Sequence, residues 1–193
     1  MPIKSRVLPA LHGKDLDQAL SQEGWRRVQE PPELAEADVE SVWRHESADA
    51  FVAWIDDREV AEHYYGLVFG AGVEAALQSL YATGAMIDAR TGIKTIQHAD
   101  TVAELGSAAR ALGLLAVGPF DREVYKVLSG LLALDNVDLQ FEALTGISLS
   151  AWPQFEQDLE AIIRKPGADP AVREDAQSIA QEQAESHWNE EFR

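Results

Sequence analysis

The chain of 193 residues contains no cysteine. This absence excludes disulfides, thiolate zinc sites and a cysteine nucleophile, and it is compatible with a reducing compartment, so we expect a cytoplasmic protein. Long hydrophobic runs are also missing. No stretch approaches the roughly 18 uninterrupted apolar residues of a membrane-spanning helix, and residues 1–12 lack a signal-peptide pattern. The sequence therefore predicts no membrane partner.

Basic residues are scarce. Sixteen Lys and Arg stand against 33 Asp and Glu, which gives a formal net charge of −17. The acidic residues form no block, as is typical of a solvated surface. Such a surface repels phosphate backbones and anionic lipids, so we expect no nucleic-acid partner. The charge has two interpretations: it aids solubility, or it attracts a basic partner.

The first half of the chain is rich in strand signals. Four stretches with aromatic and β-branched residues predict an antiparallel β-meander, at 24–28, 41–46, 50–55 and 63–69. Helices predicted at 15–22 and 71–82 would cover one face of it, because a sheet needs a second layer to bury its apolar side. Residues 86–97 fit both a helical and a strand period, and we choose the helix.

The second half of the chain contains an internal repeat. Four apolar positions recur 31 residues later: Val124, Leu128, Leu131 and Leu132 correspond to Phe155, Leu159, Ile162 and Ile163. A period of about 30 helical residues is typical of an α-solenoid, in which each unit buries its apolar face against its neighbours. The pattern predicts that Leu128, Leu131 and Ile162 are buried.

The turns between these helices resemble those of HEAT repeats, the armadillo-type α-solenoid proteins. That pattern has a first helix, a short turn with Asp and often Pro, and a second helix that opens with Val-Arg and a small residue. Residues 169–176 match it, and residues 135–143 match it with Gln140 in place of the Arg. A looser copy lies around residues 105–115, with Glu104 where an aliphatic residue is expected. The resemblance covers residues 86–186.

The resemblance implies a short right-handed HEAT-like α-solenoid after the meander. The expected fold class is therefore α+β, with an N-terminal domain at 1–83 and a helical repeat domain at 84–193. The first half is also loosely similar to uncharacterised bacterial proteins with HEAT-like tails, a similarity that implies no function.

Catalytic and metal-binding patterns are sparse. His45, Asp56 and His63 flank predicted strands and could together supply imidazole and carboxylate ligands, but they match no known metal motif, and exposed strand ends explain them as well. No Gly-rich phosphate loop or nucleophile elbow is present. We predict no catalytic residue, cofactor or metal ligand. Trp25, Trp43 and Trp54 fall on predicted strands, where core packing and an exposed aromatic anchor are the two alternatives.

In HEAT-like solenoids the second helix of each pair usually lines the concave side. Assigning the segments 121–134 and 154–165 to that position gives a mixed-charge surface as the predicted partner-binding site. Its residues are Arg122, Lys126, Asp158, Glu160 and Arg164. Asp158 and Glu160 are expected on the outer face of their helix. A solvated helix face with weak ion pairs explains the same residues without any partner.

These features favour a non-catalytic protein-interaction or adaptor module. One version is a protein that binds and neutralises a basic partner, as immunity-type proteins do. The alternative is a small enzyme or metal-binding protein that uses the rim of the N-terminal sheet. The oligomeric state is left open.

Overall fold

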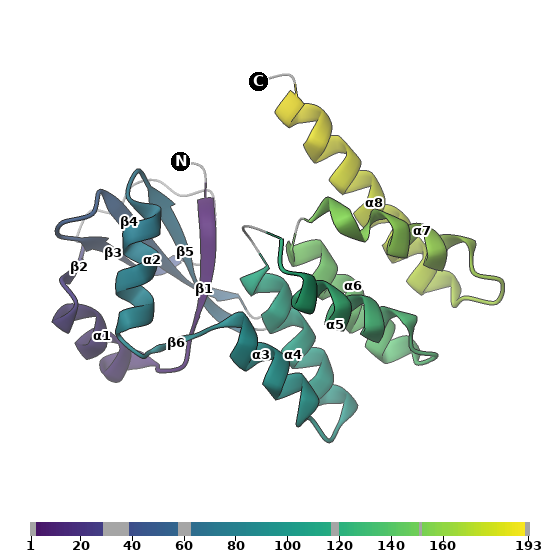
Figure 1. Ribbon diagram of the computed structural model, residues 1–193, viewed down its shortest axis with the longest axis horizontal. Helices are drawn as coiled ribbons and strands as arrows, with labels where there is room; N and C mark the ends of the chain where they lie inside the picture. The colour runs from purple at the N-terminus through teal and green to yellow at the C-terminus, as the bar shows by residue number, and fades with distance from the viewer. Residues whose placement is uncertain (1–2, 29–38, 58–62, 117–119, 151, 192–193) are drawn as a thin grey trace. The chain divides into compact units, whose positions relative to one another are not determined.

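The computed structural model describes residues 3–28, 39–57, 63–116, 120–150 and 152–191. The chain forms two compact units, Met1–Gly92 and Ile93–Arg193. The first combines a sheet with helices, and the second is built from helices wherever it is described (Figure 1). The predicted α+β class is confirmed, and the predicted domains at 1–83 and 84–193 stay a prediction.

The first unit contains an antiparallel sheet in the order β2-β3-β4-β5-β1-β6. Its strands are β1 (Ile3–Pro9), β2 (Trp25–Arg27), β3 (Val39–His45), β4 (Ala50–Asp57), β5 (His63–Gly70) and β6 (Met86–Ile87). The predicted meander is confirmed by β2 to β5, which pair in chain order. The prediction missed β1, which lies between β5 and β6.

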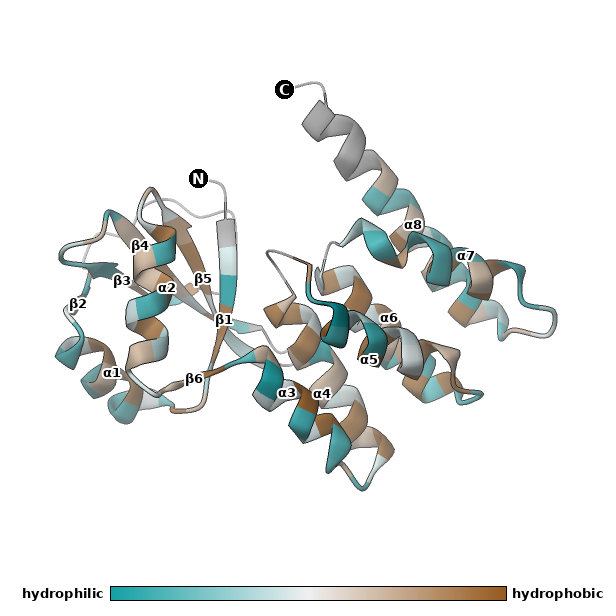
Figure 2. Ribbon diagram, in the orientation of Figure 1, coloured by the Kyte–Doolittle hydropathy of each residue, from teal (hydrophilic) through white to brown (hydrophobic). Residues whose placement is uncertain are grey.

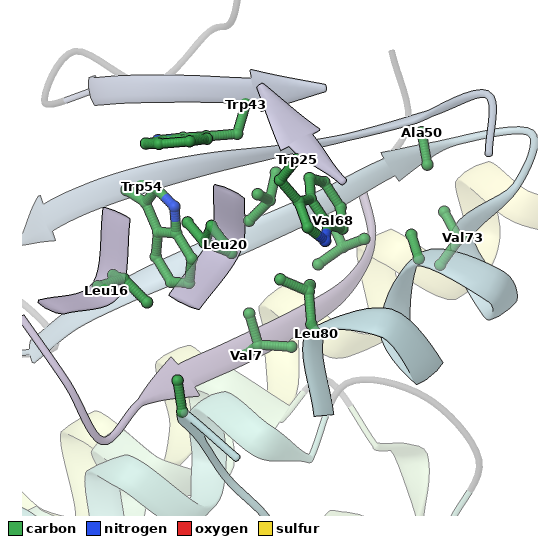
Figure 3. Packing of buried hydrophobic residues seen from close by; sticks show 13 residues of the cluster. Val7, Leu16, Leu20, Trp25, Trp43, Ala50, Trp54, Val68, Val73 and Leu80 are labelled. Atoms are coloured by element: carbon green, nitrogen blue, oxygen red, sulfur yellow. The ribbon is translucent and has the colours of Figure 1, made fainter. Parts of the chain in front are cut away.

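Two helices of the first unit pack on one face of the sheet, α1 (Gly13–Gln22) and α2 (Val73–Ala82). Leu16 and Leu20 of α1 and Leu80 of α2 form one buried cluster with apolar residues of the strands (Figure 3). Trp25, Trp43 and Trp54 belong to this cluster and are 5% exposed or less. The core-packing alternative for the three tryptophans is therefore the correct one.

The segment 86–97 divides into two elements. Met86 and Ile87 form β6, which pairs with Leu8 and Pro9 of β1, and α3 (Ala89–Gln97) follows. The helix prediction is confirmed for α3 and wrong for the first two residues. The local period allowed both a strand and a helix, and pairing with β1, which lies far away in the sequence, decides for the strand at Met86 and Ile87.

The second unit continues with α4 (Val102–Leu115), α5 (Arg122–Ala133), α6 (Val137–Ser150), a 3₁₀ turn (Pro153–Phe155), α7 (Glu156–Arg164) and α8 (Pro170–Glu191). Asp121 caps α5 by accepting hydrogen bonds from the backbone N–H groups of Glu123 and Val124. Thr101 caps α4 in a capping box with Glu104. No helix in the described part is long and apolar enough to cross a membrane.

The helices of the second unit pack in consecutive pairs. α5 packs against α6 and α7 against α8, while α6 also contacts α4 and α8. Near the start of α6 and of α8, an equivalent side chain binds the end of the preceding helix. Gln140 Nε2 donates to the carbonyl of Leu134, the C-cap of α5 (2.8 Å), and Arg173 Nη2 donates to the carbonyl of Lys165, the C-cap of α7 (3.2 Å). In both pairs a side-chain donor of the later helix thus binds the C-cap carbonyl of the earlier helix, although one donor is Gln and the other Arg.

Leu128, Leu131 and Ile162 are all buried, as the repeat pattern predicts. We expect Leu131→Ala to cost about 2–5 kcal/mol of unfolding free energy, because the truncation leaves a cavity among packed helices. Leu134→Ala is the matched control, because Leu134 is 45% exposed and should lose about 0.5 kcal/mol or less. Denaturant unfolding of both variants checks this. A loss below about 1 kcal/mol for Leu131→Ala would mean that this position contributes little packing.

Candidate partner-binding surface

The helices α5 and α7 are amphipathic, and their buried residues repeat. Val124, Leu128 and Leu131 of α5 are buried, as are Leu159 and Ile162 of α7. Figure 2 shows hydrophilic and hydrophobic residues mixed along both helices. In chain order α5 precedes α6 and α7 precedes α8 within the packed pairs. The sequence-based assignment of these segments as second helices of their pairs is therefore corrected: they are first helices.

A groove of about 480 Å³ lies between α5 and α7. Leu132 and Ile162 are its buried apolar lining, 1% and 6% exposed, while Ala133, Ala161 and Pro166 line it from exposed positions. Polar lining residues are Ser129, Asp158, Arg164 and Lys165. The groove is therefore apolar along its length, with an acidic residue toward the N-terminal end of α7 and two basic residues at the C-terminal end of that helix.

Four aromatic rings gather beside the N-terminal ends of α5 and α7. Phe120 lies 5.6 Å from Tyr125 and 5.2 Å from Trp152, and Tyr125 lies 5.1 Å from Phe155, between ring centroids. Trp152 and Phe155 stack at 6.3 Å. These rings occupy the space between the two segments at this end, whereas the groove is lined by small and aliphatic side chains nearer the C-terminal ends.

Asp158 connects the aromatic cluster to the groove. Its Oδ2 accepts a hydrogen bond from the Tyr125 hydroxyl at 2.8 Å, and this bond raises the pKa of Tyr125 because the carboxylate stabilises the protonated phenol. Asp158 is only partly exposed. The prediction that it lies freely on the outer face is wrong, because it serves as a cross-helix acceptor. Its replacement by lysine would break a structural contact as well as reverse a charge.

The remaining predicted residues are exposed, and three of them form ion pairs within their own helix. Arg164 pairs with Glu160 at 2.8 Å within α7, and Lys126 pairs with Glu123 at 2.7 Å within α5. Arg122 is exposed at the start of α5. Asp158 and Arg164 line the groove, whereas Arg122, Lys126 and Glu160 are not among its lining residues. Exposed pairs of this kind contribute little to stability, so these side chains are free to exchange partners.

Sequence reasoning identified only Asp158 and Arg164 among the nine lining residues of the groove as site residues. Lys165, which also approaches Asp135 at 3.6 Å, and the small residues Ala133 and Ala161 were not predicted as site residues. The sequence contained a sign of the groove. Alanines at exposed helix positions, next to buried aliphatic residues, are too small to cover those residues and leave a depression on the surface. Which two helices form the walls of such a depression depends on how the helices pack.

His45, Asp56 and His63, which were considered as metal ligands, do not converge in the first unit. His45 ends β3 and pairs with Trp25 of β2, whereas Asp56 pairs with Tyr64 and Asp57 with His63 at the far end of β4. Arg44 pairs with Phe51, five residues before Asp56, which separates the two ends by about 17 Å at 3.3 Å per residue. Among the described residues, no three His, Asp or Glu side chains form a group that could hold a metal ion.

His45 and Ser79 lie within hydrogen-bond distance but are not arranged as a base and a nucleophile. His45 Nδ1 accepts from the backbone N–H of Ala48 at 3.0 Å. The proton of the neutral ring is therefore on Nε2, which donates to Ser79 Oγ at 3.2 Å, as Trp25 Nε1 also does at 3.0 Å. A nitrogen that donates to a hydroxyl cannot also take its proton. The cluster holds α2 against β2 and β3.

No protein-family model, curated protein or solved structure matches the chain.

Proposed function

We propose that the protein is a non-catalytic protein-interaction module that holds a segment of a partner protein in the groove between α5 and α7. The groove carries the proposal. It combines buried aliphatic lining, exposed small residues and ionic groups at both ends, the composition of surfaces that recognise peptides through a few apolar anchors. The exposed Phe120 and Leu134, 43% and 45% exposed, precede and follow α5 and extend the apolar area available to a partner.

In the same proposal, the second unit is a short right-handed HEAT-like solenoid in which α5–α6 and α7–α8 are successive repeats. Equivalent apolar positions are buried in α5 and α7, and Gln140 and Arg173 close the two turns in the same way. α6 contacts both α4 and α8, so the second helices form a continuous row. Solenoids of this type function by presenting extended concave surfaces, which supports binding over catalysis in general. The groove between α5 and α7 lies on the row of first helices, so its own lining is what supports it as the binding site.

The net charge of −17 supports a partner that is basic overall. Long-range attraction accelerates encounter between oppositely charged proteins, and salt weakens it because exposed charges are screened beyond about 8–10 Å. The association rate of such a partner should therefore fall as salt rises. The alternative, an enzyme or metal-binding protein acting at the sheet rim, gains no support from the positions of His45 and Asp56 at opposite ends of the strands.

Filling the groove should abolish binding. Ala161 is exposed and lines the groove, so Ala161→Trp places an indole over Leu132 and Ile162 without burying a new polar group. Ala103→Trp, at an exposed position of α4 that does not line the groove, is the matched control. We expect at least one protein to be captured from the native cells by wild type and by the control, with a loss of about tenfold or more for Ala161→Trp.

Quantitative mass spectrometry of the captured proteins measures this loss, and circular dichroism checks that both variants fold. Equal capture of every protein by Ala161→Trp and Ala103→Trp would remove the groove as the binding site. A captured partner whose association rate does not change with salt would remove the electrostatic part of the proposal.

A further inference from the structure

Given the proposed binding function of the groove, we infer that its occupant is a short amphipathic α-helix with a cationic or amide-donor group at the Asp158 end and an acidic group at the Arg164–Lys165 end. This occupant differs from a uniformly basic segment, which the net charge alone would favour. Its N-terminus would lie near Asp158, so that it runs parallel to α7.

The walls of the groove favour a helical occupant. Both walls are helices, so they offer no strand edge with which an extended peptide could pair. Recognition must therefore use side chains. Apolar residues of a helix recur at i, i+3, i+4 and i+7 on one face, which is the pattern that an apolar groove between two helices accommodates.

The length of the groove limits the occupant to about two turns. Asp158 and Lys165 are seven residues apart on α7, which is about 10 Å at 1.5 Å per residue. Two turns present two or three apolar side chains to the buried lining formed by Leu132 and Ile162. A longer partner helix would continue over the exposed Leu134 beyond α5.

The ionic groups at the two ends give the occupant a direction. Tyr125 engages one oxygen of Asp158, and a carboxylate can accept further hydrogen bonds through its second oxygen. At the other end, the side chain of Arg164 is 76% exposed and that of Lys165 is 39% exposed. Each makes one ion pair, and both groups have additional donors. The positive N-terminus of a helix favours Asp158, and its negative C-terminus favours the two cations.

A displayed library of amphipathic helical peptides tests this inference. Lys, Glu and Gln are varied at two positions seven residues apart, which matches the separation of Asp158 and Lys165, and leucines are fixed on the same face between them. Peptides that bind wild type are counter-selected against Ala161→Trp. We expect enrichment of Lys or Gln at the N-terminal end and Glu at the C-terminal end. Arg164→Glu combined with Lys165→Glu should weaken a selected peptide about tenfold and favour Lys at its C-terminal end.

Arg122→Glu combined with Lys126→Glu is the matched control. It changes the net charge by the same amount on exposed residues outside the groove, so the affinity should stay within about twofold if local contacts decide it. Asp158→Asn retains an acceptor for Tyr125 while removing the charge, and it should reduce the preference for Lys at the N-terminal end.

Peptides that bind wild type and fail on Ala161→Trp but show no charge preference would overturn the inference and leave the proposed function intact. Selection of uniformly basic peptides would do the same. If no peptide distinguishes wild type from Ala161→Trp, a helical occupant of the groove is excluded, and the capture of native partners then decides the proposed function separately.

Discussion

Replacing Gly113 with alanine should unfold the second unit or cost it at least about 3 kcal/mol. Gly113 lies in α4 where this helix crosses α6, and a Cβ atom there would be 2.1 Å from the carbonyl oxygen of Gly146. A Cβ atom at Gly146 would be 2.6 Å from the carbonyl oxygen of Ala109. The obstacles are backbone atoms of packed helices, which cannot rotate away as a side chain can, so the helices must separate.

The separation would also weaken a polar contact between the same helices. Arg110 of α4 forms an ion pair with Glu142 of α6, and their side chains are only 12% and 26% exposed. A poorly solvated charge that loses its partner is strongly destabilising. The expected loss for Gly113→Ala therefore exceeds the roughly 1–3 kcal/mol that ordinary overpacking costs.

Gly130→Ala is the control for Gly113→Ala. Gly130 is also in the interior of a helix, but a Cβ atom there would meet no atom within 4 Å. Alanine should stabilise α5 by about 0.5–1 kcal/mol through its higher helix propensity. Urea unfolding followed by circular dichroism compares the two variants. A Gly113→Ala protein as stable as wild type would show that α4 and α6 do not approach as closely as described.

Trp54→Ala should cost the first unit about 3–5 kcal/mol. Trp54 is 1% exposed in β4, and its ring stacks on Tyr64 at 5.7 Å between centroids. It also fills the space above Gly66, where a Cβ atom would lie 2.7 Å from Trp54 Cζ3. Removing the indole leaves a large cavity in the middle of the cluster that α1 and α2 cover (Figure 3).

Trp54→Phe keeps an aromatic ring at this position and removes only part of its volume. The indole Nε1 is buried and makes no hydrogen bond within the described part of the chain, so phenylalanine loses volume but no polar contact. We expect it to lose less than half of what alanine loses. Hydrogen exchange of β4 and β5 reports on this unit alone. Similar losses for both variants would show that the stack on Tyr64 contributes little.

The sequence alone determined most of the local structure. The apolar period located α5, and the aromatic and β-branched stretches located β2 to β5. These signals depend on residues within a few positions of one another, so they can be read without knowing the fold. The same period identified Leu128, Leu131 and Ile162 as buried, because a helix has one apolar face whatever packs on it.

Only the tertiary structure decided which distant residues meet. β1 forms a strand because it pairs with β5, and β6 because it pairs with β1. The local pattern did not predict β1 and left the segment that contains β6 ambiguous between strand and helix. His45 and Asp56 belong to opposite ends of the sheet because antiparallel pairing reverses the direction of β4. Asp158 was recognised as a charged residue of α7, but its hydrogen bond to Tyr125 depends on how α7 lies against α5.

The groove between α5 and α7 also depends on the tertiary structure. Its aliphatic lining follows from the helical period, whereas its opening depends on the spacing of α5 and α7 at their C-terminal ends. Aromatic rings occupy the N-terminal end of that space, and small residues such as Ala133 and Ala161 leave the other end unfilled. The sequence fixes the chemistry of each helix face, because a face is set by residues three and four positions apart. The distance between two faces is set by packing among residues far apart in the chain.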